Sequence, residues 1–264
     1  MTEKSFSLEE VLSPESLILM DSSAGRNHVE LAGSWYASEI YPIKSFYKVD
    51  LKKLQLKIRE TLIMRYISLF PQTRTVQEVQ REIEDFSKIL NRKLFQMNKH
   101  YGFASIEKKR DVPNDYYQKS DEVKKHFEEL CFCINQLVNR SGKIALMNHL
   151  ETPENNQLFR IAEIVAERPG IIKGFEERYP IFLEKKENNL KTDESLTATA
   201  FYQAAYNGQQ VRILTGDSDI GRISRGMRKI IKTSPNFRDL KRQLLQNWPQ
   251  VYFFRTGEES VKVA

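Results

Sequence analysis

Cysteine and histidine are scarce in this chain of 264 residues. The two cysteines, Cys131 and Cys133, stand two apart in a segment with a helical pattern. Residues two apart on a helix do not face each other, so we expect no disulfide between them. Unpaired thiols are typical of a reducing compartment, which favours a cytoplasmic location. The four histidines are scattered without metal-ligand spacing and give no basis for a structural zinc site.

Membrane and secretory signals are also missing. The longest apolar stretch, residues 130–138, contains Asn135 and Gln136 and is too short to span a bilayer. The N-terminus, MTEKSFSLEEVLSPE, is acidic and amphipathic, whereas a secretory signal is basic and then apolar. We therefore expect no membrane partner and no secretory signal.

The charge of the chain is unevenly placed. The net charge is +6, and residues 221–246 alone carry eight Lys or Arg against one acidic residue, Asp239. A basic run is most often a solvated helix face, but it is also what holds a nucleic-acid backbone. Hydrophobic residues make up 40% of the chain, which is sufficient for one sizeable core.

Short apolar runs alternate with amphipathic segments along the chain. The predicted strands are 16–20, 66–70, 211–215 and 251–254. The predicted helices are 28–41, 50–64, 75–97, 121–139, 157–167, 172–185 and 193–207, with a loop at 101–120. This alternation predicts an α/β fold, a three-layer α/β/α sandwich with a central parallel sheet. Residues 1–264 would form one domain, with 99–150 as a helical insertion or cap.

Several carboxylates stand where predicted elements begin or end. Asp21 follows the first predicted strand, Asp217 and Asp219 follow the strand 211–215, and Asp193 opens an alanine-rich helix. In open α/β sheets, functional sites form at the carboxyl edge of the strands, where these residues would meet. Each also has a simpler explanation, because acids are common at helix starts and in turns.

A further acid comes from the predicted helix 75–97. Glu82 lies on the border of its apolar stripe, three residues after Val79 and four before Phe86. A carboxylate on that border can reach a sheet edge while the helix packs on the sheet. Glu78 is the competing candidate on the same helix, and a solvated surface acid is the alternative for either.

Four segments together resemble the PIN-domain family of metal-dependent nucleases. They are LILMDSS at Asp21, TRTVQEVQREIEDF around Glu82, DESLTATA from Asp193 and TGDSDI at Asp217, and they occur in the family order. Ile220 stands where the family usually has an aromatic residue. The chain also departs in length from small members of the family, because over a hundred residues separate Glu82 from Asp193.

The resemblance implies a role for each of these residues. Asp21, Glu82, Asp193 and Asp217 would hold one or two Mg²⁺ or Mn²⁺ ions, with Asp219 as a further ligand. Ser22, Ser23 and Thr215 would be supporting hydroxyl donors to these ligands or to phosphate. The nucleic-acid backbone would be held by a set of basic residues: Arg222, Arg225, Arg228 and Lys229.

The implied function is a divalent-metal-dependent endoribonuclease. Two alternatives stand beside it: a catalytically silent PIN-like module that binds RNA or protein, and a flap or 5′ nuclease acting on DNA. The resemblance further implies RNA as the partner, with DNA as the alternative. It leaves open a homodimer and a protein inhibitor or antitoxin.

Overall fold

The computed structural model describes residues 5–24, 51–107, 116–146, 152–167, 191–256 and 261–263. The strands are β1 (Ser5–Phe6), β2 (Leu17–Met20), β3 (Thr73–Val76), β4 (Ala145–Leu146), β5 (Val211–Thr215), β6 (Gln250–Phe253) and β7 (Val261–Val263). The helices are α1 (Leu8–Val11), α4 (Leu51–Ser68), α5 (Gln77–Glu107), α6 (Tyr116–Ile144), α7 (Pro153–Ala166), α10 (Thr192–Tyr206), α11 (Ser218–Thr233) and α12 (Arg238–Leu244), with a short 3₁₀ turn at Pro235–Phe237.

The strands form one sheet in the order β1-β7-β6-β5-β2-β3-β4. The five strands β6-β5-β2-β3-β4 are all parallel, while β7 and β1 add to the β6 edge in antiparallel fashion. The chain moves outward from β2 to β3 and β4, then returns to β5 on the other side of β2 and continues to β6. The direction of travel therefore reverses between β2 and β5, which makes their carboxyl ends the topological switch point.

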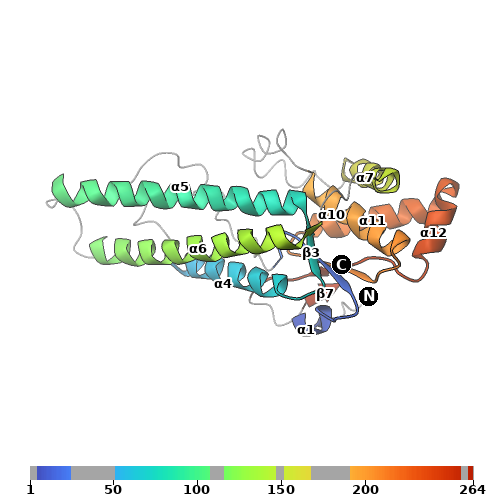
Figure 1. Ribbon diagram of the computed structural model, residues 1–264, viewed down its shortest axis with the longest axis horizontal. Coiled ribbons are helices and arrows are strands. Elements are labelled where there is room, and N and C mark those ends of the chain that lie inside the picture. Colours follow the sequence, from blue (N-terminus) through green and yellow to red (C-terminus); the bar gives the residue numbers. More distant parts are fainter. Residues whose placement is uncertain are drawn as a thin grey trace.

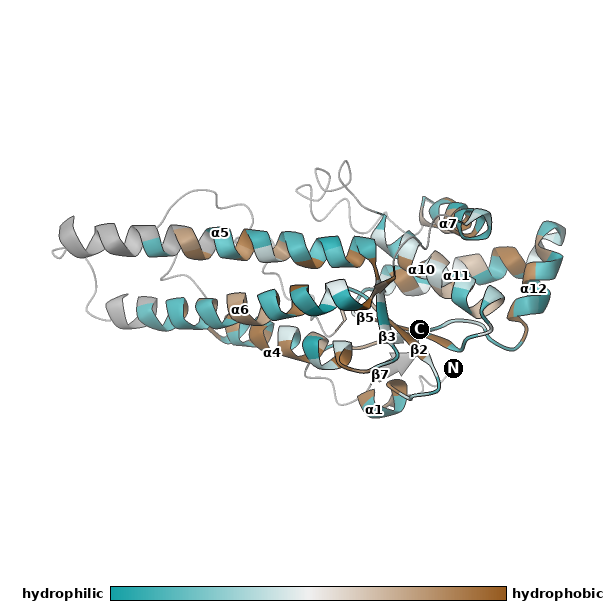
Figure 2. Cartoon of the chain, in the orientation of Figure 1, coloured by the Kyte–Doolittle hydropathy of each residue, from teal (hydrophilic) through white to brown (hydrophobic). Residues whose placement is uncertain are grey.

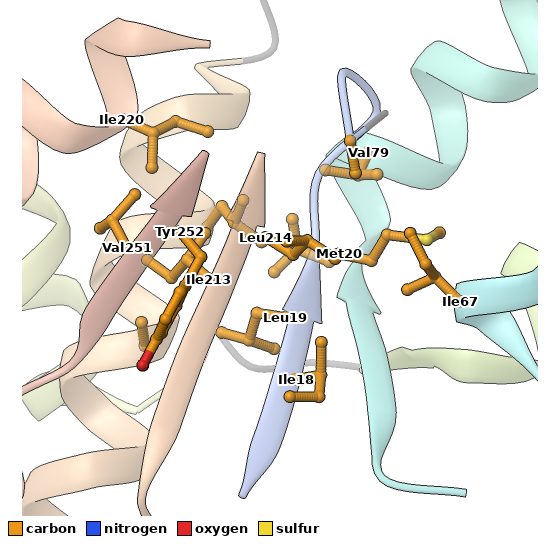
Figure 3. Packing of buried hydrophobic residues seen from close by; sticks show 14 of the residues in the cluster. Ile18, Leu19, Met20, Ile67, Val79, Ile213, Leu214, Ile220, Val251 and Tyr252 are labelled. Carbon is orange, nitrogen blue, oxygen red and sulfur yellow. The ribbon is translucent and has the colours of Figure 1, made fainter. Parts of the chain in front are cut away.

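Unbroken apolar sequence explains why β2 and β5 are central. Ile18, Leu19 and Met20 are fully buried in β2, as are Ile213 and Leu214 in β5. A strand covered on both faces is expected to show such a continuous run rather than alternation. Figure 3 shows these side chains packed together across the adjacent strands, and Figure 2 shows the same strands as predominantly hydrophobic.

Helices lie on both sides of the sheet. Figure 1 shows α4, α5 and α6 on one side and α7, α10, α11 and α12 on the other, with α5 and α6 extending well beyond the strands. The alanines of α10, including Ala198, Ala200 and Ala204, are completely buried, so this helix packs closely against its neighbours. The fold is α/β with a parallel sheet, as predicted, and the arrangement is compatible with three layers.

The predicted strand at 66–70 is wrong, because these residues end α4 and begin the following turn. The run YISLF is apolar, and such a short run does not distinguish a buried strand from part of a helix. In α4, Ile67 is buried, whereas Tyr66 is 47% and Leu69 54% exposed. The second strand is instead β3, and Thr75 is buried inside it rather than capping a helix.

Helix ends and the predicted insertion also differ from expectation. The loop predicted at 101–120 contains the last turns of α5 and the first of α6, since an established helix extends at little cost. Helix α6 packs on α4 and α5 and leads into β4, so the segment 99–150 supplies a strand of the sheet. The helices predicted at 28–41 and 172–185 lie outside the described residues.

The cysteines follow the prediction. Cys131 and Cys133 are free thiols buried on α6, and burial raises the pKa of Cys131 to about 11.

None of the described helices has the length and apolar character needed to cross a membrane.

One close contact joins α11 to α7 and gives the first prediction. A Cβ at Gly226 would lie 2.4 Å from Cγ1 of Val165, which is buried. We expect Gly226→Ala to lower the free energy of unfolding by about 1–2 kcal/mol, because this clash outweighs the gain in helix propensity. In a Val165→Ala background the same substitution should stabilise by up to about 1 kcal/mol. Urea denaturation of the four proteins measures both effects, and equal signs would contradict this account.

Candidate acidic site

Asp21 lies at the carboxyl end of β2 and is held by its surroundings. Asp21 is 3% exposed, and its backbone N–H donates to the carbonyl of Leu214 in β5 (3.0 Å). Carboxylate Oδ1 accepts the N–H of Ser22 (2.7 Å), and Oδ2 accepts the hydroxyls of Ser23 and Thr215, the latter at 2.8 Å. Burial raises the pKa of the Asp21 carboxyl, and these hydroxyl donors oppose the rise.

Thr215 connects the ends of β2 and β5. Its hydroxyl donates to Asp21 and accepts the backbone N–H of Asp217 (2.9 Å). The hydroxyl of Ser23 makes a second connection, because it accepts the N–H of Gly216 (3.0 Å) while donating to Asp21. The two loops that follow the central strands are thus joined by two hydroxyl groups, one from each loop.

Glu82 reaches the same edge from α5. Its Oε2 accepts the hydroxyl of Ser22 (2.5 Å), and its Oε1 accepts the hydroxyl of Thr192 (2.6 Å). Ser22 follows Asp21, and Thr192 precedes Asp193. Glu82 therefore links the loop after β2 to the first turn of α10, across 60 residues on one side and 110 on the other.

Glu78 lies one turn away on α5 and makes a different contact. It is buried, and its Oε2 accepts the hydroxyl of Ser195 (3.0 Å), one turn further along α10. Glu78 thus fastens α5 to the body of α10, whereas Glu82 contacts the residues next to Asp21 and Asp193. This difference favours Glu82 as the acid of the cluster.

Asp193 completes the group electrostatically. Burial is the main cause of a pKa well above the usual range for its carboxyl, and the charges of Asp21, Asp217 and Glu82 raise that pKa further. Asp217 in turn raises the pKa of Asp21. The charges of the other three acids therefore all disfavour the charge on Asp193, which places them within electrostatic reach of it.

Asp217 and Asp219 have structural roles as well. Asp217 is the N-cap of α11, and its Oδ1 accepts the backbone N–H of Asp219 (2.9 Å). Asp219 forms an ion pair with Arg222, with Nη1 and Oδ1 3.2 Å apart. Asp217 therefore has the capping role that is common for an acid at a helix start. Asp219 pairs with Arg222, and the hydrogen bonds described above do not join it to Asp21.

The first turn of α10 is entered through an unusual backbone conformation. Lys191, the residue before the helix, has φ of 50° in the left-handed region, which favours glycine. Its ammonium group pairs with Glu163 of α7. This tether sets the point at which α10 begins, and hence the positions of Thr192 and Asp193.

The eight basic residues of 221–246 are all exposed. On α11 they occupy the face opposite the buried Ile220, Ile223, Met227 and Ile231. Since α11 begins directly after Asp217, this basic face starts beside the acidic cluster. We refer to the exposed Lys and Arg of α11 and α12 as the basic face.

The donor set fits a hard divalent cation in its chemistry, because Mg²⁺ and Mn²⁺ prefer carboxylate oxygens. A cation would also relieve the mutual repulsion of the four acids. Within the part of the chain that the structure describes, however, no three His, Cys, Asp or Glu side chains are grouped so that they could hold a metal as they stand. Binding would require carboxylates such as Glu82 to exchange hydroxyl partners for the ion.

The structure adds one hydroxyl residue to those singled out from sequence. Ser22, Ser23 and Thr215 were expected as supporting groups, and all three contact cluster acids. Thr192, which donates to Glu82, completes the set. Its position next to Asp193 was the available signal, but threonine is too common at turns and helix starts for this to single it out.

Comparison of the chain with protein families, with curated proteins and with solved structures finds no match in any of the three.

The raised pKa of Asp193 predicts that its charge destabilises the metal-free fold. An acid whose pKa is higher in the folded state binds its proton more tightly there, so stability falls as the pH rises above its unfolded value near 4. We expect Asp193→Asn to raise the free energy of unfolding at pH 7 in EDTA by about 1 kcal/mol. The gain should vanish near pH 3, where the carboxyl is protonated in both states.

Asp239→Asn is the matched control, because Asp239 also lies in the first turn of a helix but is exposed. It should lose about 0.3–1 kcal/mol of favourable interaction with the helix dipole. Urea denaturation of both variants at the two pH values makes the comparison. A destabilised Asp193→Asn protein at pH 7 would show that the carboxylates do not oppose one another.

Proposed function

We propose that this chain is a divalent-metal-dependent endoribonuclease of the PIN-like type, with Asp21, Glu82, Asp193 and Asp217 as its acidic centre. One observation carries the proposal: hydroxyl groups of Ser22, Thr192 and Thr215 link the four segments that hold these acids, at the switch point of a parallel sheet. The strand order and the helices on both sides of the sheet support the PIN-like form of the three-layer sandwich.

Mg²⁺ or Mn²⁺ held by these acids, with Asp219 as a further ligand, would supply Lewis acidity and a water activated for attack on phosphorus. The chain's own residues prepare this centre. Ser23 and Thr215 fix the orientation of Asp21, while Ser22 and Thr192 do so for Glu82. Such supporting groups limit the movement of the acids and tune their basicity.

The basic face gives the second line of support. A cluster of carboxylates repels a polyanion, so an enzyme acting on RNA needs cations beside it. Arg222 lies one turn into α11 and Arg225, Arg228 and Lys229 follow, all exposed. These residues would neutralise backbone phosphates on the strand that enters the centre. RNA is therefore the proposed partner, and the protein partners considered from sequence remain proposals that rest on the family resemblance alone.

A turnover role is favoured over a silent binding module by the cost of the acidic cluster. Burial and neighbouring charge raise the pKa of Asp193 well above its usual range, which means that the cluster weakens the metal-free fold. A module that only binds RNA or protein gains nothing from such an arrangement. The hydroxyl partners of Asp21 and Glu82 support the catalytic alternative.

Cleavage should depend on the metal and on Asp21. We expect the protein to cleave mixed single-stranded RNA with Mn²⁺ or Mg²⁺ and not with EDTA. Asp21→Asn should reduce the rate by at least about 100-fold, because a ligand is lost and its supporting hydrogen bonds are altered. Gel assays of labelled RNA measure the rate. The control is Asp85→Asn, an exposed acid of α5 paired with Lys88, which should cleave at the normal rate.

Other outcomes of this assay would favour the alternatives. Tight RNA binding without cleavage by the wild type would support the silent module. Preferential cleavage of a DNA flap would support the DNA nuclease. Equal activity of the wild type and Asp21→Asn would remove Asp21 from the centre.

Glu82 and Glu78 can be separated by paired substitutions. Glu82→Gln should lower cleavage by at least about 100-fold with little effect on stability. Glu78→Gln should retain activity within about 10-fold, since Glu78 contacts Ser195 away from the other acids. Thr192→Val should show an intermediate loss of about 10-fold, because it removes one hydroxyl that positions Glu82. Rates at saturating Mn²⁺ together with thermal unfolding make the test, and the reverse ranking of the two glutamates would contradict it.

A further inference from the structure

A small cavity lies between α11 and the start of β6, outside the acidic cluster. It has a volume of about 160 Å³ and is lined by residues that include Gly221, Ser224, Arg225 and Arg228 of α11 and Gln250 of β6. These side chains supply guanidinium, hydroxyl and amide donors, and no acidic residue lines the cavity. The space is several times the roughly 30 Å³ of a water molecule in the liquid, so a phosphate group can enter it.

Small residues of α11 create this space. Gly221 and Ser224 are three apart and share the buried side of the helix that faces β6. Ile220, Ile223 and Met227 on the same helix are large and buried, so the cavity lies where the row of large side chains is interrupted.

The two arginines of the cavity keep their charge available. Among the described residues, neither Arg225 nor Arg228 forms an ion pair with a carboxylate, whereas Arg222 pairs with Asp219. Arg228 is held by Trp248, with its guanidinium carbon 5.0 Å from the ring centroid. Stacking of this kind restrains the side chain and leaves the edge of the guanidinium free for a bidentate contact with phosphate.

The cavity lies at a defined distance from the acidic cluster. Helix α11 starts at Ser218, next to Asp217, and rises about 1.5 Å per residue. Arg225 and Arg228 therefore lie about 10–15 Å along the helix axis from that start. This distance separates the cavity from the acidic cluster along α11, so a strand whose phosphate occupies the cavity can run along the helix toward the acids.

We propose that the cavity between α11 and β6 binds a backbone phosphate of single-stranded RNA at a point separated from the acidic centre by about two to three turns of α11. The proposal rests on the proposed function for RNA as the ligand. It differs from general attraction to the basic face, because one phosphate occupies one defined pocket. Arg225 and Arg228 contact its oxygens, with Ser224 as a further donor.

The test measures anisotropy of a fluorescein-labelled oligouridylate of eight nucleotides in EDTA, where cleavage cannot occur. Arg225→Ala should weaken binding about 10-fold and reduce the salt dependence of log K by about 0.7, the value for one lost phosphate contact on a single strand. Arg59→Ala is the matched control, because Arg59 is an exposed residue of α4 that belongs to neither the basic face nor the cavity. It should weaken binding no more than about 2-fold.

A second variant tests the cavity without changing the charge. Ser224→Leu fills the space and should weaken binding to a similar degree as Arg225→Ala, with thermal unfolding used to confirm that the protein remains folded. Equal losses in Arg225→Ala and Arg59→Ala, or unchanged binding by a folded Ser224→Leu protein, would overturn the proposal. Displacement of the oligomer by low millimolar inorganic phosphate would also overturn it, since free phosphate would then be the ligand of the cavity.

Failure of this inference and failure of the proposed function give different results. A wild type that binds RNA through Arg225 but never cleaves it would contradict only the nuclease proposal. A wild type that cleaves RNA while Arg225→Ala and Ser224→Leu keep the same KM would contradict only the phosphate cavity. If both proposals hold, these two variants raise KM with little change in kcat, because the contact is made equally in the ground and transition states.

Discussion

The pairing of β2 with β5 is the constraint on which the rest of the site depends. Its register sets Met20 beside Leu214, so Asp21 and Thr215 emerge together at the end of adjacent strands. One residue of slippage would turn every side chain to the opposite face of the sheet. The hydroxyl contacts between the two loops, the capping of α11 by Asp217 and the placement of the basic face all follow from this register.

The site combines opposite electrostatic demands within a short distance. Carboxylates that raise the pKa of Asp193 lie beside a helix whose outer face carries only basic charge beyond its first turn. Hydroxyl groups stabilise Asp21 and Glu82, but they do not cancel the repulsion between acids. Under the proposed function a cation would relieve this repulsion, and a phosphodiester bound between the acidic centre and the basic face would satisfy both charges.

Sequence patterns were most informative where burial is complete. The runs at β2 and β5 and the alanine-rich α10 predicted the central strands, the helix behind them and the shared edge for Asp21, Asp193 and Asp217. The run at 66–70 misled because helix and strand share its composition, and tertiary packing decided between them. Long-range contacts such as Thr192 with Glu82 join residues 110 apart and leave no local pattern to detect. The cavity beside Arg225 depends on Gly221 and Ser224 facing β6, which only the packed structure reveals.

The strand order has a consequence for the time at which the centre forms during synthesis. Strand β2 can pair with β3 early, but its other neighbour, β5, is translated about 190 residues later. At about 5–20 residues per second, this gap corresponds to about 10–40 s. During that interval the nascent chain holds Asp21 and Glu82 without Asp217 or the basic helix that follows it. A ribosome-bound fragment that stops before β5 therefore lacks Asp217 and the whole basic face, so the proposed activity toward RNA depends on synthesis continuing through β5 and α11.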